Sequence, residues 1–148
     1  MKKLVPTLCL FVFLLSGCNA KNVDEVDVPT IDQHLWTMAS AQSVDAEGQI
    51  VAYGPDGNST LDTAIEVVLT CSASEGVLVL NDETNEQTHS GVYKLTDTSQ
   101  DSLIYEVTVG KTEGVAVVSM TTYHDESQLP TLIIRLGDYA LNLYADSQ

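Results

Sequence analysis

The strongest constraint on the fold is an alternation of apolar and polar side chains that repeats through much of the chain. Apolar residues occupy every second position from Leu103 to Val109, from Ile65 to Cys71 and from Tyr139 to Leu143. Successive side chains of a β-strand point to opposite faces, so this period marks strands with one buried face. After residue 18 no segment shows the apolar spacing of an amphipathic helix. The chain therefore predicts an all-β domain.

Nine strands are expected, because turn residues interrupt the alternation repeatedly. The Gly137-Asp138 pair is short enough for a tight hairpin loop in which glycine supplies a positive φ. The expected strands cover residues 35–41, 49–53, 64–71, 76–80, 88–95, 102–109, 114–123, 130–136 and 138–144.

Short strands at close spacing favour antiparallel pairing of consecutive strands. A meander of about eight or nine such strands can form a small closed barrel, and a β-sandwich is the alternative. Closure is favoured because open sheet edges invite pairing with other chains. An eight-stranded barrel is filled by side chains or holds one small ligand, and the sequence leaves both open. Closure would bring together five apolar side chains of the first strand and the last two: Trp36, Leu132, Ile134, Leu141 and Leu143.

The N-terminal segment has the order of a secretory signal. Lys2 and Lys3 precede an apolar run over residues 4–15, and small residues then precede Cys18. The run is shorter than the roughly 20 residues of a membrane-spanning helix. The sequence Leu15-Ser16-Gly17-Cys18 resembles the lipobox of bacterial lipoprotein precursors.

This resemblance implies that residues 1–17 are a signal peptide and that Cys18 is lipidated. The lipid would be a thioether-linked diacylglycerol, usually with an N-acyl chain such as palmitate, and several acyl chains make anchoring stable. In Gram-negative lipoproteins an Asp after the cysteine tends to retain the protein at the inner membrane. Since Asn19 stands there, the resemblance favours the outer membrane over the inner membrane of the cell envelope.

Acidic side chains dominate the chain that follows Cys18. Removal of residues 1–17 leaves four basic and 21 acidic side chains, a formal charge of −17. Nucleic acid is excluded as a partner because its binding depends on Lys and Arg. The membrane partner is reached through the lipid on Cys18, and a basic envelope or extracellular protein is the protein partner that the charge favours.

The expected domain organisation has three parts. Residues 1–17 are the signal peptide, residues 18–33 are the lipidated cysteine with a flexible acidic tether, and residues 34–148 are the β-barrel-like domain. The tether is expected from Asp24, Glu25, Asp27, Pro29 and Asp32, which stand in a stretch without a sustained apolar period.

A single unpaired cysteine remains in the expected domain. Cys9 leaves with the signal peptide and Cys18 is acylated, so Cys71 has no partner for an intrachain disulfide. Cys71 ends an alternating run, which predicts an inward-facing, buried thiol rather than a reactive one.

No catalytic or metal-binding motif stands in the sequence, so we expect a protein without enzymatic activity, cofactor or metal. His34, His89 and His124 are far apart, and the stretch from His124 to Glu126 is explained by a polar turn. Asp56, Asn58 and Asp62 fail as a calcium loop, because Leu61 and Val67 occupy the positions of its Gly and closing Glu. Six tyrosines could line a ligand cavity or pack at a barrel rim.

A lipobox, a tether, a first strand around Trp36 and a terminal hairpin over residues 132–144 resemble META-domain lipoproteins of the outer membrane. The family's central Gly-Cys-Asn element has no counterpart, since Thr70 and Ser72 flank Cys71. The resemblance implies a small β-rich domain, often linked to envelope stress. The charge of −17 and the missing catalytic motifs lead us to expect a protein-interaction or envelope-maintenance module. The strand count and the tyrosines favour the alternative, a lipocalin-like carrier of a small apolar or amphipathic ligand.

Overall fold

A computed structural model describes residues 27–55 and 65–146, which form ten strands and no α-helix. Accordingly, none of these residues belongs to a helix that could cross a membrane. The strands are β1 (Trp36–Val44), β2 (Ile50–Gly54), β3 (Ile65–Glu66), β4 (Leu69–Ser74), β5 (Val77–Asp82), β6 (Gln87–Thr98), β7 (Ser102–Val109), β8 (Thr112–Thr122), β9 (Gln128–Leu136) and β10 (Tyr139–Ala145).

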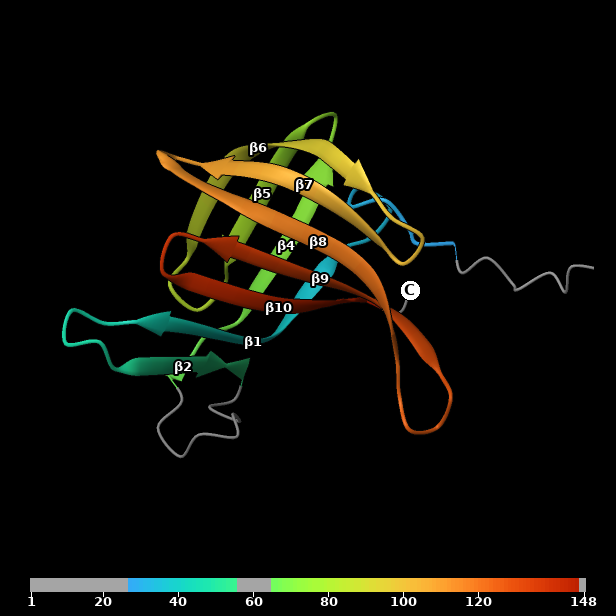
Figure 1. Ribbon diagram of the computed structural model, residues 1–148. Coiled ribbons are helices and arrows are strands. Elements are labelled where there is room, and N and C mark those ends of the chain that lie inside the picture. The colour runs from blue at the N-terminus through green and yellow to red at the C-terminus, as the bar shows by residue number, and fades with distance from the viewer. Residues whose placement is uncertain (1–26, 56–64, 147–148) are drawn as a thin grey trace, which may run out of the picture.

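Eight of these strands form a closed antiparallel barrel (Figure 1). Strands β4 to β10 pair consecutively, and β1 closes the circle by pairing with β10 on one side and β4 on the other. Strands β2 and β3 extend the sheet outside the barrel and are parallel to each other. The prediction of a small closed antiparallel barrel is confirmed, and the sandwich alternative is wrong.

A β-bulge changes the phase of the closing strand. Trp36 and Met38 point inward, the pairing with β10 shifts between Met38 and Ser40, and Ala41 and Ser43 then point inward. An extra residue in one strand of a pair has this effect on the alternation. Beyond the bulge the strand pairs with β2 as far as Val44 opposite Ile50, so it extends past the predicted end at residue 41.

The predicted strand 64–71 is divided into two. Ile65 pairs with Tyr53 of β2, whereas β4 begins at Leu69 and pairs with β5 and β1. Ile65 is 50% exposed, so the start of the expected inward-facing run lies outside the core, while Cys71 at its end is fully buried. The split occurs because β1 pairs with β4 only at Trp36 and Thr37 and with β2 from Ala41 onward.

The middle of the barrel is filled by side chains from every barrel strand except β6, whose Tyr93 packs against the core in a partly buried position. This core contains the five residues that barrel closure was predicted to unite, namely Trp36, Leu132, Ile134, Leu141 and Leu143. Apolar burial of this kind is the main favourable contribution to folding. The interior at this level is therefore solid, because its side chains occupy the space that a ligand would need.

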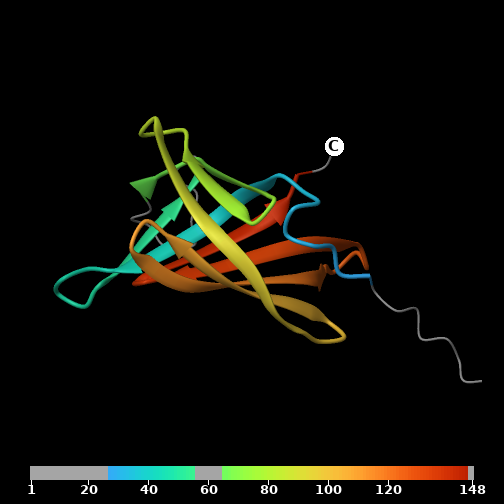
Figure 2. The same ribbon diagram turned by 90° about the horizontal axis from the view of Figure 1, so that it is seen from above.

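One end of the barrel is covered by residues 27–35, drawn in blue in Figure 2. Ile31 is 0% exposed, its N–H donates to the Tyr105 hydroxyl at 3.2 Å, and its carbonyl accepts from Trp36 Nε1 at 2.8 Å. Val28 also packs against the core. The predicted tether of residues 18–33 is therefore too long, because its last residues from Val28 onward belong to the barrel.

Two glycines, Gly114 and Gly137, allow backbone geometry that other residues would hinder. A Cβ on Gly114 would lie 2.1 Å from the Arg135 carbonyl oxygen, so only glycine allows β8 to approach β9 this closely. Gly137 has a φ of 57° in the two-residue loop between β9 and β10, where Leu136 pairs with Tyr139. The predicted tight hairpin is confirmed.

Truncation of Ile31 tests whether residues 27–35 are part of the folded barrel. We expect Ile31→Ala to lower the free energy of unfolding by about 2–5 kcal/mol, as for other fully buried aliphatic side chains. Denaturant titration followed by the fluorescence of Trp36 measures this change. The control is the exposed neighbour Asp32. The free energy of unfolding of Asp32→Ala should stay within about 0.5 kcal/mol of that of the parent. Equal, small effects of both changes would show that the segment is not docked.

Candidate functional site

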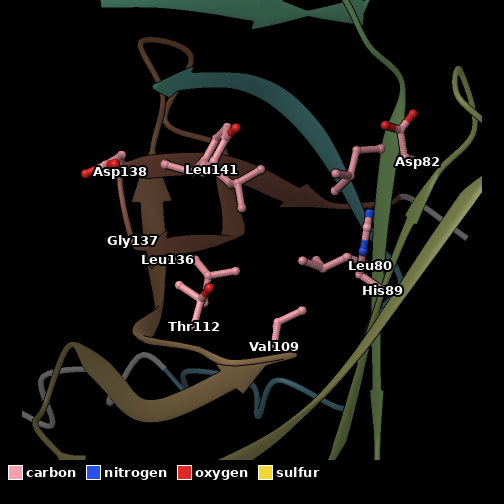
Figure 3. Close-up of a pocket in the computed structure, with 11 residues that line it drawn as sticks. Leu80, Asp82, His89, Val109, Thr112, Leu136, Gly137, Asp138 and Leu141 are labelled. Carbon is pink, nitrogen blue, oxygen red and sulfur yellow. The ribbon is translucent and has the colours of Figure 1, made fainter. Parts of the chain in front are cut away.

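The end of the barrel opposite to Ile31 contains a cavity of about 660 Å³. Strands β4, β5, β6, β7, β8, β9 and β10 each contribute at least one side chain to it. Figure 3 draws its lining residues as sticks and labels most of them. The lining residues are Leu69, Leu80, Asp82, His89, Val109, Thr112, Leu136, Gly137, Asp138, Tyr139 and Leu141.

The walls of the cavity are apolar. Leu80, Val109 and Leu136 project from three different strands toward the same space (Figure 3). Each belongs to the inward-facing set of its strand, since Val107 precedes Val109 and Ile134 precedes Leu136 at two-residue spacing. Leu80 is buried, whereas Val109 and Leu136 are only partly buried. The cavity thus leaves apolar surface accessible at the edge of the core.

Polar side chains lie around the apolar walls. His89 shares the inner face because it pairs with Leu80 across β5 and β6. The Thr112 methyl group lies 3.2 Å from the position that a Cβ on Gly137 would take, so it faces the β9–β10 loop. The Asp82 carboxylate accepts hydrogen bonds from Asn85, at 2.9 Å from its backbone N and 2.8 Å from Nδ2. These contacts fix the orientation of the carboxylate.

This combination of walls and rim suits reversible binding. Small-molecule sites are typically concave spaces of roughly 300–1,000 Å³ with mostly apolar linings and a few placed polar groups. The cavity has such a size and lining. A ligand would bury the accessible faces of Val109 and Leu136, and apolar burial contributes about 25 cal/mol per Å².

The three histidines that the sequence presents lie at separate places. His34 packs edge-on against Trp36, with ring centroids 5.6 Å apart, at the covered end of the barrel. His89 lines the cavity at the other end, and His124 lies in the β8–β9 loop. Among residues 27–55 and 65–146, no three His, Cys, Asp or Glu side chains are close enough together to hold a metal ion.

The loop over residues 123–127 is a polar turn, as predicted. Asp125 accepts hydrogen bonds from the backbone N–H and the hydroxyl of Ser127, and these bonds lower the pKa of its exposed carboxyl group. Both bonds join residues of the same turn, and they form no binding site for a metal or ligand. The calcium-loop candidates Asp56, Asn58 and Asp62 lie outside the described residues, as do Cys18 and Asn19.

The tyrosines do not gather at one site. Tyr105 is buried in the core, where its ring meets that of Tyr93 edge-on at 5.8 Å. The Tyr53 hydroxyl bonds to Ser43 Oγ at 3.1 Å. Tyr139 is exposed and lines the cavity. Of these four tyrosines, Tyr139 is the one that lines the cavity.

The family resemblances gain no support from known proteins. Comparison of the chain with protein families, curated proteins and solved structures finds no match. The likeness to META-domain lipoproteins therefore stays a prediction.

The sequence did not indicate that the residues around the cavity lie together. Val109 and Leu141 belong to predicted alternating runs and Leu80 ends a predicted strand, but the alternation does not tell which end of a barrel is covered. Asp82 stands next to a hairpin loop and Asp138 stands in one, and acidic residues are common at such positions. Their common location follows only from the pairing of β5 to β10.

Cys71 is not part of the site. Its side chain is fully buried, which confirms the predicted core position, and burial raises the pKa of its thiol from 9.0 to about 12. The neutral thiol is thus stable in the folded protein, and the nucleophilic thiolate is suppressed.

We expect Cys71 to resist alkylation until the barrel unfolds. At pH 8 the raised pKa lowers the thiolate fraction about a thousandfold relative to an unfolded chain, before steric protection is counted. Iodoacetamide labelling with peptide mass mapping measures this, because it separates Cys71 from Cys9 and Cys18. The same shift stabilises the fold below pH 9, and this contribution is lost as the pH rises toward 12. Equal labelling of folded and denatured protein would contradict the buried position.

Proposed function

We propose that this protein is a membrane-anchored lipoprotein of the cell envelope whose open barrel end binds a small apolar or amphipathic ligand without catalysing a reaction. The observation that carries the proposal is the cavity of about 660 Å³, with partly buried leucine and valine side chains in its walls. The envelope location rests on the lipobox-like sequence that ends at Cys18.

The contrast between the two barrel ends supports a binding role. Ile31 fills one end, where both of its backbone polar groups are bonded to core side chains. The other end keeps a hollow space between Leu80, Val109 and Leu136. The filled core next to the cavity packs against these walls, and a pre-formed site loses little conformational entropy on binding.

A second candidate is a protein-interaction module that binds a basic envelope protein. The β1–β2 hairpin protrudes from the barrel in Figure 1 and ends in Val44 and Ile50, which are 51% and 64% exposed. Asp45 and Glu47 stand in the same hairpin loop. An apolar tip beside acidic residues suits a basic partner. Salt-sensitive crosslinking to a basic protein that persists after the cavity is blocked would favour this candidate.

Blocking the cavity tests ligand binding directly. The neutral dye N-phenyl-1-naphthylamine should bind residues 19–148 and gain fluorescence, because the apolar walls shield it from water. In Thr112→Trp an indole ring replaces a small side chain of the lining, and we expect the affinity to fall by at least about tenfold. The matched control is Thr122→Trp, at the other end of β8, which should bind like the parent. If Thr112→Trp binds the dye as tightly as the parent does, the dye binds outside the cavity.

Removal of the proposed lipid-bearing thiol tests the location. In a Gram-negative host, Cys18→Ser should abolish labelling by an alkynyl palmitate and move the protein out of the membrane fraction. Serine cannot form the thioether that the lipid requires. Cys9→Ser controls for changes in the apolar segment and should be labelled normally. Palmitate label retained by Cys18→Ser would contradict the lipoprotein assignment.

A further inference from the structure

We infer that the cavity selects amphiphiles with a cationic head group, which Asp82 holds while the apolar tail enters the barrel. This inference rests on the proposed ligand-binding function and adds the charge and orientation of the ligand. It follows from the charges around the cavity and from the order of side chains along β5.

The charge around the cavity is strongly acidic. Among its lining residues Asp82 and Asp138 carry carboxylates, and no Lys or Arg contributes. The β5–β6 loop adds Glu83 and Glu86, whereas the β7–β8 loop adds Lys111. The lining and these two loops together contain four acidic side chains, one lysine and His89. Low-dielectric walls concentrate such a potential, which attracts cations and repels a fatty-acid carboxylate.

Asp82 is the side chain best placed to bind a cationic head. It is partly buried on the inner face, where its strand neighbours in the sheet are Leu69 and Gln87. Asn85 donates one hydrogen bond to each carboxylate oxygen. Each oxygen can accept a second bond, so the group remains able to bind an ammonium. A positioned carboxylate makes a charge-assisted hydrogen bond, which is stronger than a neutral one.

Strand β5 also provides the apolar end of the site. Leu80 lies two positions before Asp82 on the same face, and Leu78 lies two positions deeper and is fully buried. Side chains two residues apart on a strand are roughly 6.6–6.8 Å apart along its axis. A ligand aligned with β5 therefore meets a carboxylate at the rim, leucine below it and the filled core beneath. This depth fits a short tail better than a long one.

Three six-carbon probes of equal tail length test the inference: hexylammonium, hexan-1-ol and hexanoate. We use the full chain in zwitterionic nanodiscs, with empty nanodiscs as the blank, and titrate each probe by ligand-observed NMR. Hexylammonium should bind about tenfold more tightly than hexan-1-ol, as a charge-assisted hydrogen bond allows, and hexanoate should bind most weakly.

Asp82→Asn should abolish the preference for hexylammonium over hexan-1-ol, which is measured as the ratio of the two affinities. Asp101→Asn removes the same charge in the loop at the covered end of the barrel and should keep the preference. Thermal unfolding of both variants verifies that they remain folded, since asparagine preserves the shape of the side chain.

The outcomes separate this inference from the proposed function. Equal binding of the three probes, all blocked by Thr112→Trp, would overturn the cationic preference and leave ligand binding standing. A preference that survives Asp82→Asn, or that Asp101→Asn also removes, would overturn the role of Asp82. Failure of every probe and of N-phenyl-1-naphthylamine to bind would overturn the proposed function itself.

Discussion

The pairing of β1 with β10 is the interaction on which the rest of the structure depends. It joins the first barrel strand to the last, from Trp36 opposite Ala145 to Ser43 opposite Tyr139. Without it, two long edges would expose unpaired backbone groups, which in sheets invite association with other chains. Closure also turns the inner faces of eight strands toward one another. The core is therefore assembled from residues more than 100 positions apart, and it needs no disulfide among the described residues.

The alternation in the sequence was enough to predict the class of fold, because a two-residue period has one structural meaning over such lengths. Leu103, Tyr105 and Val107 point inward as expected, and so do Leu141 and Leu143. The prediction was least accurate where pairing partners change. The bulge after Met38 reverses the phase of β1, and the strand around Val67 divides because β2 replaces β4 beside β1. These events depend on tertiary pairing, which local patterns do not encode.

The site was harder to predict than the fold for a similar reason. A sequence shows which residues face inward, but the difference between a filled and a hollow barrel depends on what covers each end. Ile31 stands in a stretch of acidic and polar residues that has no strand pattern, yet it is among the most buried side chains. Isolated apolar residues such as Val28 and Ile31 in such a stretch are a weak signal. Because this residue covers one end, the open space lies at the other.

The location of Ile31 gives the barrel a direction relative to its proposed anchor. Asp27 is nine residues after Cys18, and nine residues span at most about 30 Å when fully extended. The chain enters the barrel at the covered end. With lipid on Cys18, the point where the chain enters the barrel would stay within this distance of the bilayer surface. The acidic mouth lies at the other end of the barrel, so the tether would limit the distance of the covered end more tightly than that of the mouth.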